Sequence, residues 1–385
     1  MTTESRFHFQ VYETEPVIKA IASCKFVTPV RLGILFFLLV SLSLTVWAVI
    51  TGGENSDDYV TYLENISWSI SLLYLFPFVI GLTLRFYQGI PDLFEYLFEN
   101  TLQEKQPEQI DNFRKWLSGR FNGYLHPVVF MGATFVLNCL YFHQILERED
   151  PSWMVGGPIL MDVLSSRQGL TPVGAYAALI QVVLIYWALV LIWKVVIFSW
   201  GLHEFFNAGK FNIKLDPWHP DGSCGLKRIS STCMFFNYIL LLFGVYISLK
   251  VIDKILVQEL PLFSDIGNPL MLGGYAILAP LLFFFPLGAP HYKMKAEKEQ
   301  FISRISQKGK MLFEKLIRAD FKSAGLENEI QIFQKLEETR NDLIRTIPVW
   351  PFNFKSIEAF LGMIVIPLLP SFLSLVFNFF FKINK

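Results

Sequence analysis

The sequence predicts an all-α membrane protein with six to seven transmembrane helices and a cytoplasmic helical hairpin. Hydrophobic residues make up 53% of the 385 residues and include 38 Phe, which is more than a soluble core of this size could bury. Several apolar runs reach the ~20 residues that a helix needs to cross the ~30 Å hydrocarbon core of a bilayer. These runs are 31–51, 66–88, 127–146, 172–199, 232–249 and 268–290, with a seventh at 357–381.

The distribution of basic residues predicts the orientation of these helices. Of the 33 Lys and Arg residues, 26 lie in or at the ends of the N-terminal, second, fourth and sixth connecting segments, and 4 lie in the alternate ones. Because loops rich in Lys and Arg stay in the cytoplasm, we expect the N-terminus and the long polar tail to be cytoplasmic. The use of Phe, Ile and Lys, without a eukaryotic sorting motif, favours a bacterial inner membrane.

We divide the first part of the chain at the boundaries of the apolar runs. Residues 1–30 form a cytoplasmic N-terminal segment, and 31–290 form a six-helix transmembrane domain with cytoplasmic connections at 89–126 and 207–231. In the first of these connections we expect separate helices to begin at the two prolines, since proline suits the first turn of a helix. They are Pro91 and Pro107.

The second part of the chain is polar and then apolar again. Residues 291–348 carry two amphipathic stripes separated at Gly325, which predicts an antiparallel cytoplasmic helical hairpin. Residues 349–385 form a C-terminal membrane segment, for which we favour a crossing over a re-entrant hairpin. Proline interrupts helical hydrogen bonds. We therefore expect bends or kinks at Pro280, Pro286, Pro367 and Pro370.

The connection 207–231 contains the most distinctive polar run, DPWHPDGSCGL at 216–226. Its prolines restrict the backbone, its glycines permit positive φ, and its aspartates can cap helix N-termini. A rigid loop is therefore one interpretation. In the other, His219 and Asp221 share a ligand or a proton. The residues assigned to the structural loop are Asp216, Pro220, Gly222 and Gly225.

This loop resembles one found in a group of uncharacterised bacterial polytopic inner-membrane proteins. In that group a His-Pro-Asp-x-x-Gly-Gly-Leu loop lies between two spans, and a Trp-Pro-Phe motif precedes an apolar C-terminal segment. Here the loop reads His-Pro-Asp-x-x-Cys-Gly-Leu, with Cys224 in place of the first paired glycine, and Trp-Pro-Phe begins at Trp350. The resemblance implies a shared fold and carries no established activity.

Histidine placement raises the hypothesis of a divalent-metal site at the cytoplasmic rim. Imidazole and carboxylate groups are the ligand types that zinc accepts. The alternative is that polar residues collect at the membrane interface without binding a metal. The four cysteines show no CxxC spacing, so a cysteine metal site has little support. The candidate ligands are His203, Glu204, His219, Asp221 and His291.

Polar residues within the apolar runs raise the hypothesis of a pore or cavity. Lys194 lies in the fourth run, where it can extend toward the inner interface or face a water-filled cavity. Asn138, in the third run, can line the same cavity or form an interhelical hydrogen bond. His143 and Gln144, near the outer end of that run, complete the candidate set.

The sequence favours an oligomeric channel or transport-like protein with a cytoplasmic regulatory helical region. It contains no Walker loop, GxSxG, HExxH or dinucleotide fingerprint. Two alternatives are a membrane-embedded enzyme with a metal or acid–base site at the rim, and a non-catalytic scaffold or sensor. The expected partners are membrane lipids, further copies of the chain and a cytoplasmic protein, and nucleic acid is not expected.

Overall fold

The computed structural model describes most of the chain. The described residues are 29–51, 70–71, 75–104, 106–148, 155–157, 169–207, 210–216, 219–253, 267–318, 326–352 and 354–382. The N-terminal segment 1–28 and the turn at Gly325 therefore lie outside the described residues. Only the backbone is described at 29, 41, 44–51, 141, 143–148, 155–157, 169, 267–269, 326, 354–356, 374–375 and 377–382.

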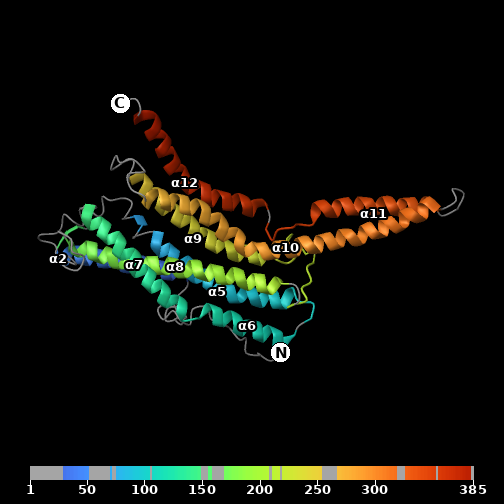
Figure 1. Cartoon of the computed structure of the whole chain (residues 1–385), viewed down its shortest axis with the longest axis horizontal. Helices are drawn as coiled ribbons and strands as arrows, with labels where there is room; N and C mark the ends of the chain where they lie inside the picture. The colour runs from blue at the N-terminus through green and yellow to red at the C-terminus, as the bar shows by residue number, and fades with distance from the viewer. Residues whose placement is uncertain are drawn as a thin grey trace.

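The described part is helical apart from one short antiparallel ribbon (Figure 1). Each of the seven predicted apolar runs overlaps a helix. These helices are α2 (Pro29–Thr51), α5 (Phe76–Asn100), α7 (Leu125–Arg148), α8 (Pro172–Phe206), α9 (Lys227–Ile252), α10 (Gly267–Arg318) and α12 (Phe354–Lys382). The remaining elements are α6 (Pro107–Phe121), α11 (Leu326–Thr346) and the paired strands β1 (Val155–Gly157) and β2 (Gly169–Leu170).

Within the described residues, four stretches are long and apolar enough to cross a membrane. They begin at Pro107, Pro172, Lys227 and Leu270, and the first of them covers α6 and part of α7. Shorter apolar helices occupy Val30–Val40 and Ile357–Leu373. The class of all-helical protein with membrane-length apolar helices is thus confirmed at this level.

One helix boundary differs from the prediction. No separate helix begins at Pro91; instead α5 continues through that proline to Asn100. The residues that follow Pro91 on the core-facing side are fully or almost fully buried, so tertiary packing holds the helix in spite of the missing N–H. These residues are Leu93, Phe94, Leu97 and Phe98. The second proline behaves as expected, since α6 begins at Pro107.

Helix α10 joins the apolar bundle to the polar hairpin without interruption. It contains 52 residues, about 78 Å at about 1.5 Å per residue, and passes through Pro280, Pro286 and Pro290. The predicted boundary at 290/291 is therefore not a break in the helix. Figure 1 shows the distal half of α10 projecting from the bundle with α11 antiparallel beside it. The ammonium of Lys298 joins them by donating to the carbonyl of Ile344 (2.6 Å).

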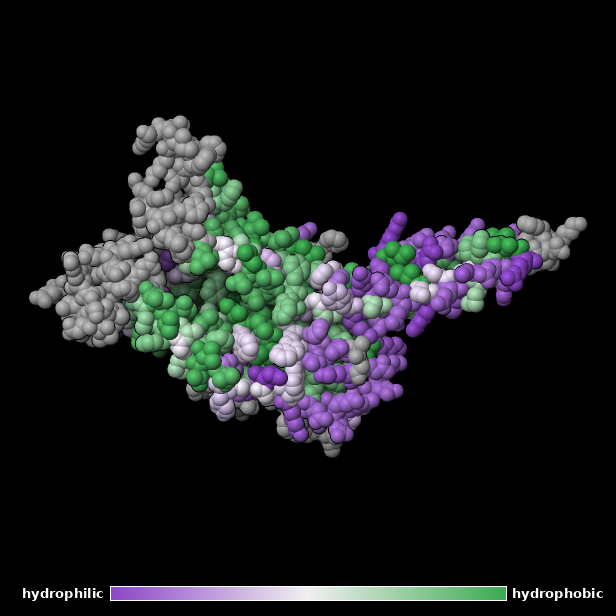
Figure 2. Space-filling view, in the orientation of Figure 1, coloured by the Kyte–Doolittle hydropathy of each residue, from purple (hydrophilic) through white to green (hydrophobic). Residues whose placement is uncertain are grey.

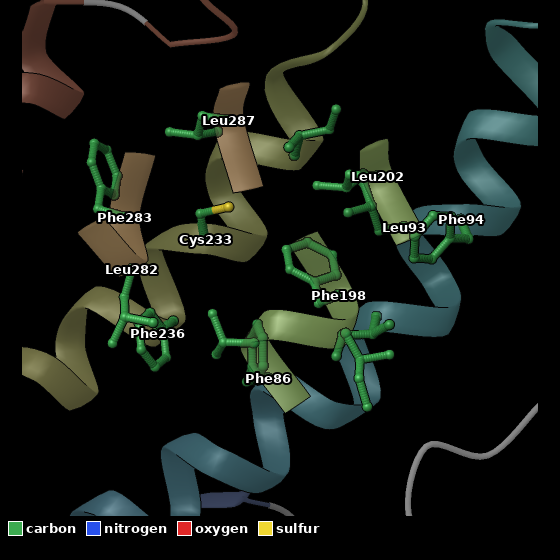
Figure 3. Packing of buried hydrophobic residues seen from close by; sticks show 14 of the residues in the cluster. Phe86, Leu93, Phe94, Phe198, Leu202, Cys233, Phe236, Leu282, Phe283 and Leu287 are labelled. Atoms are coloured by element: carbon green, nitrogen blue, oxygen red, sulfur yellow. The ribbon is translucent and has the colours of Figure 1, made fainter. Parts of the chain in front are cut away.

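The bundle interior is filled by apolar and aromatic side chains from α5, α8, α9 and α10 (Figure 3). Phe86 packs edge-on against Phe198 with ring centroids 5.7 Å apart, and it also contacts Phe236. The gap between these four helices has no space for a water molecule. This part of the bundle interior, between α5, α8, α9 and α10, is therefore closed and apolar.

Helix α12 packs against α9 at the position of its prolines. Helix α12 contains Pro367 and Pro370, and Figure 1 shows it bent along its length. Ser248 of α9 donates to the carbonyl of Pro367 and contacts the hydroxyl of Ser371 (2.8 Å). The Ser248 hydroxyl of α9 therefore provides a hydrogen-bond donor to a backbone carbonyl of α12.

Gly244 allows this close approach, so we expect Gly244→Ala to destabilise the bundle by about 1–3 kcal/mol. A Cβ at this position would lie 2.6 Å from the hydroxyl oxygen of Tyr275 and 3.1 Å from the Cβ of Pro367. Thermal unfolding of the purified protein in detergent measures the loss. Gly132→Ala is the matched control, because a Cβ there meets no atom within 4 Å. Equal effects of the two changes would contradict the proposed close packing.

Candidate functional site

The connection between α8 and α9 is held against the connection between α5 and α6 by a short backbone ladder. Leu102 and Ile213 form an isolated antiparallel bridge. On either side of it, Gln103 donates to the carbonyl of Asn212 (2.9 Å) and Lys214 donates to that of Thr101 (2.9 Å). Aromatic rings pack beneath this ladder, and they come from α5, α6, α8 and the connection itself. They are Phe94, Phe98, Phe113, Phe205 and Phe211.

His219 and Asp221 come together in this connection, as their spacing predicts. The Nδ1 atom of His219 lies 2.9 Å from Oδ1 of Asp221. The same oxygen accepts the backbone N–H groups of Ser223 (2.8 Å) and Gly225 (3.0 Å). The second carboxylate oxygen, Oδ2, accepts the N–H of Lys227 (3.2 Å), the first residue of α9. Asp221 thus closes the loop and caps the helix that follows it.

The loop requires left-handed backbone at three closely spaced residues. The φ angles are +65° at Gly222, +56° at Cys224 and +85° at Gly225. Glycine adopts this conformation without a steric cost, whereas a residue with a Cβ is destabilised by roughly 1 kcal/mol or more. Cys224 is the only non-glycine residue with positive φ in the part of the chain that the structure describes. Cys224 therefore adopts a backbone conformation that glycine favours.

The loop shifts the acidity of two of its own groups. Partial burial raises the pKa of the Asp221 carboxyl. The hydrogen bonds from three backbone N–H groups and from His219 lower it by more than burial raises it, so this pKa lies below its usual value of 3.8. The reverse holds for Cys224. Burial and the nearby carboxylates of Asp221 and Asp216 raise the pKa of its thiol to about 11. At neutral pH the loop holds a carboxylate and a protonated, unreactive thiol.

Tyr96 of α5 anchors this loop to the bundle. Its hydroxyl donates to the carbonyl of Gly225 (3.2 Å), and the Arg228 guanidinium lies over its ring, 5.0 Å from the centroid. No motif in the sequence indicates this role for Tyr96. A tyrosine near the end of an apolar run is common at a membrane interface, and no local pattern indicates that it contacts a residue 129 positions away.

The other candidate metal ligands have different partners. Glu204 pairs with Lys210 (2.6 Å), and His203 is exposed on α8. His291 contacts the carbonyl of Val349 through Nδ1 (2.7 Å) and stacks on Trp350 with a ring separation of 3.8 Å. Of the described residues, no three or more His, Cys, Asp or Glu form a group that could hold a metal ion. Metal binding stays a prediction and does not enter the proposed function.

Lys194 is fully buried and caps a helix. Its ammonium donates to the carbonyl of Phe121, the last residue of α6, at 2.6 Å, and it lies over the rings of Tyr87 and Phe121. The last carbonyls of a helix lack helical partners, and a positive charge is favourable there. The side chain does not reach solvent, as an extended interfacial lysine would. Lys194 lies in the second half of α8, and the side of a membrane that this half faces stays a prediction.

The candidate cavity residues of α7 are only partly described. Asn138 is buried and donates from Nδ2 to the carbonyl of Thr134 in its own helix (2.8 Å). The oxygen of the Asn138 amide, the hydroxyl of Thr134 and Nε2 of His126 are buried and have no hydrogen-bond partner among the described residues. The side chains of His143 and Gln144 lie outside the described part of the structure.

Comparisons with protein-family models, with curated proteins and with solved structures found no match to this chain. The resemblance of the His-Pro-Asp loop to a group of inner-membrane proteins therefore stays a prediction. Function has to be argued from the geometry of the chain itself.

The carboxylate of Asp221 makes the loop sensitive to acid. A depressed native pKa means that its stabilising contribution is complete above the ordinary pKa of about 3.9 and is lost as the pH falls through the lower native value. We expect Asp221→Asn to lower the free energy of unfolding by about 1–2 kcal/mol at pH 7. The free energies of unfolding of the two proteins should converge as the pH falls below the usual pKa of 3.8, and a difference that is independent of pH would contradict the capping role.

Replacing the strained cysteine with the residue that its backbone prefers should stabilise the loop. We expect Cys224→Gly to raise the free energy of unfolding by about 0.5–1 kcal/mol, since the relief of the positive φ exceeds the added unfolded-state entropy. Cys224→Ala is the control, because it removes the sulfur and keeps the Cβ. Chemical unfolding of the two variants in detergent tests this, and a stabilisation by alanine equal to that by glycine would rule out backbone strain as the cause.

Proposed function

We propose that the protein is a non-catalytic inner-membrane scaffold whose cytoplasmic hairpin, formed by distal α10 and α11, assembles copies of the chain into a homo-oligomer. One observation carries this proposal. Helix α10 runs unbroken from a candidate span into the hairpin, so a contact made at the hairpin is linked to the bundle by a continuous helix. This arrangement suits a membrane protein whose copies associate with one another through the hairpin.

In this proposal α2, α5, α7, α8, α9 and α10 cross the membrane, and α12 is a bent seventh span. The positive-inside distribution supports a cytoplasmic N-terminus and hairpin. The surface supports the same placement, because Figure 2 shows hydrophilic residues along the hairpin and at the adjoining end of the bundle, and mostly hydrophobic residues over the rest of the coloured part of the bundle. The apolar side chains exposed on the bundle would then contact lipid.

The hairpin exposes apolar side chains that its own two helices leave uncovered. Phe313 and Phe333 pack between the helices with their ring centroids 5.7 Å apart. Met311 and Ile317 of α10 remain 58% and 66% exposed, and Ile332 of α11 remains 44% exposed. Figure 2 shows hydrophobic residues gathered near the free end of the hairpin. A helical pair with such a surface in an aqueous compartment favours association.

Charge complementarity favours a second copy of the chain as the partner. Residues 291–318 contain eight Lys or Arg and three Asp or Glu, whereas α11 contains five acidic and three basic residues. Every ion pair found between described hairpin residues joins two positions of the same helix, as in Lys293–Glu297 and Arg340–Glu337. The net charges of the two helices therefore remain available to pair basic α10 of one copy with acidic α11 of another.

The hairpin should control the oligomeric state of the full-length protein. We expect Met311→Gln with Ile317→Gln to weaken self-association at least tenfold, because each change removes apolar contacts of about 1 kcal/mol and tenfold corresponds to about 1.4 kcal/mol. Light scattering of the purified protein in detergent over a concentration series measures this. Ile344→Gln, at the base of the hairpin, is the control and should associate as the wild type does.

A wild-type protein that stays monomeric at every concentration, or equal weakening by the control, would refute the scaffold proposal. Higher salt should also weaken association, since it screens the charges on the two helices.

The channel hypothesis remains the second candidate because of the buried polar groups of α7. His126, Thr134 and Asn138 recur at intervals of eight and four residues, so they lie on one face of the helix. Buried groups without partners are found where water or ions pass through a membrane protein. Ion flux through liposomes that contain the purified protein separates this candidate from the scaffold.

A further inference from the structure

A pocket of about 340 Å³ lies at the start of α9, and Tyr96 is not among the residues that line it. Ser223 of the loop and Phe352 of the Trp-Pro-Phe motif form its sides. The remaining lining residues recur at intervals of three and four, so they share one face of α9. They are Lys227, Ser230, Ser231, Met234, Phe235 and Tyr238.

The polarity of this face changes along the helix. The first turns present an ammonium and two hydroxyls, from Lys227, Ser230 and Ser231. The next turns present the apolar side chains of Met234 and Phe235. Because α9 runs from the polar loop into the apolar bundle, the polar half of the pocket lies toward the loop and the apolar half lies at the depth of the hydrocarbon.

The polar half contains groups that other residues do not satisfy. Ser223 and Ser230 are 2% and 5% exposed, and no hydrogen bond between described residues uses either hydroxyl. No ion pair with a described residue involves the Lys227 ammonium, which is exposed. The neighbouring carboxylate of Asp221 is already occupied by three backbone N–H groups and His219. The unmatched groups are hydrogen-bond donors, as an anionic ligand requires.

We infer that this pocket binds an anionic phospholipid of the cytoplasmic leaflet. The phosphate lies near Lys227 and the serine hydroxyls, and the upper part of an acyl chain lies along Met234 and Phe235. A free phosphate could use the polar half but would leave the apolar half unfilled, so the amphipathic lining favours a lipid. The inference depends on the membrane placement proposed above, but it is independent of self-assembly through the hairpin.

Native mass spectrometry of the full-length protein in detergent, with phosphatidylglycerol or phosphatidylcholine added, tests this site. We expect the wild type to retain phosphatidylglycerol in preference to phosphatidylcholine, and Lys227→Gln to weaken that retention about fivefold. Arg228→Gln is the matched control, because it removes the same charge one residue further on. The Arg228 guanidinium lies over the ring of Tyr96 and does not line the pocket.

A second variant tests occupation of the pocket without changing its charge. Ser231 is exposed and its hydroxyl bonds only within its own turn, to the carbonyl of Arg228 (2.9 Å). We therefore expect Ser231→Leu to fold normally, to fill part of the polar half and to lower phosphatidylglycerol retention. The thermal midpoint of each variant verifies that its fold is intact.

Three results would overturn the inference. Equal losses in Lys227→Gln and Arg228→Gln would show that only the general surface charge attracts lipid. Equal retention of phosphatidylcholine would show that the pocket does not select a negative headgroup. Displacement of phosphatidylglycerol by inorganic phosphate at equal concentration would identify a site for free anions instead of lipid.

Discussion

The satisfaction of polar backbone groups at helix ends is the constraint on which this structure depends. The last carbonyls and first N–H groups of a helix have no partners within that helix, whether lipid or water surrounds them. Here charged side chains from other parts of the chain bond to these groups. Lys194 donates to a carbonyl at the C-terminus of α6, Lys298 donates to carbonyls at the C-terminus of α11, and Asp221 accepts an N–H at the N-terminus of α9. Each of these contacts also joins two elements.

The two lysines show how one residue type serves two different surroundings. Lys194 is completely buried, and its charge is accommodated by a carbonyl oxygen and by the faces of two aromatic rings. Lys298 lies on the hairpin and bonds to the carbonyls of Ile344 and Ile347. A hydrogen bond from a charged donor contributes about 1.5–3 kcal/mol. Lys194 therefore stabilises the fold only because its ammonium reaches the carbonyl of Phe121 and the two rings.

Aromatic side chains and two glycines determine how closely the helices approach. Phe rings fill the space between α5, α8, α9 and α10. A Cβ at Gly201 would lie too close to the side chains of Phe94 and Leu117. A Cβ at Gly244 would likewise lie too close to the Tyr275 hydroxyl. Small residues opposite large ones are a common means of helix association in membranes, where apolar burial supplies little driving force. The Trp-Pro-Phe segment joins this packing through Trp350, which stacks on His291.

The sequence by itself determined the helical class, the approximate extent of each apolar helix, the start of α6 at Pro107 and the pairing of His219 with Asp221. All of these depend on local periodicity or on residues close together in the chain, which a single sequence displays. The tertiary structure decided the rest. Continuity of α5 through Pro91, the capping of Phe121 by Lys194 and the contact of Tyr96 with Gly225 all depend on which helices are neighbours. The separation of the rim histidines has the same cause, because helix ends that share one side of a membrane need not converge.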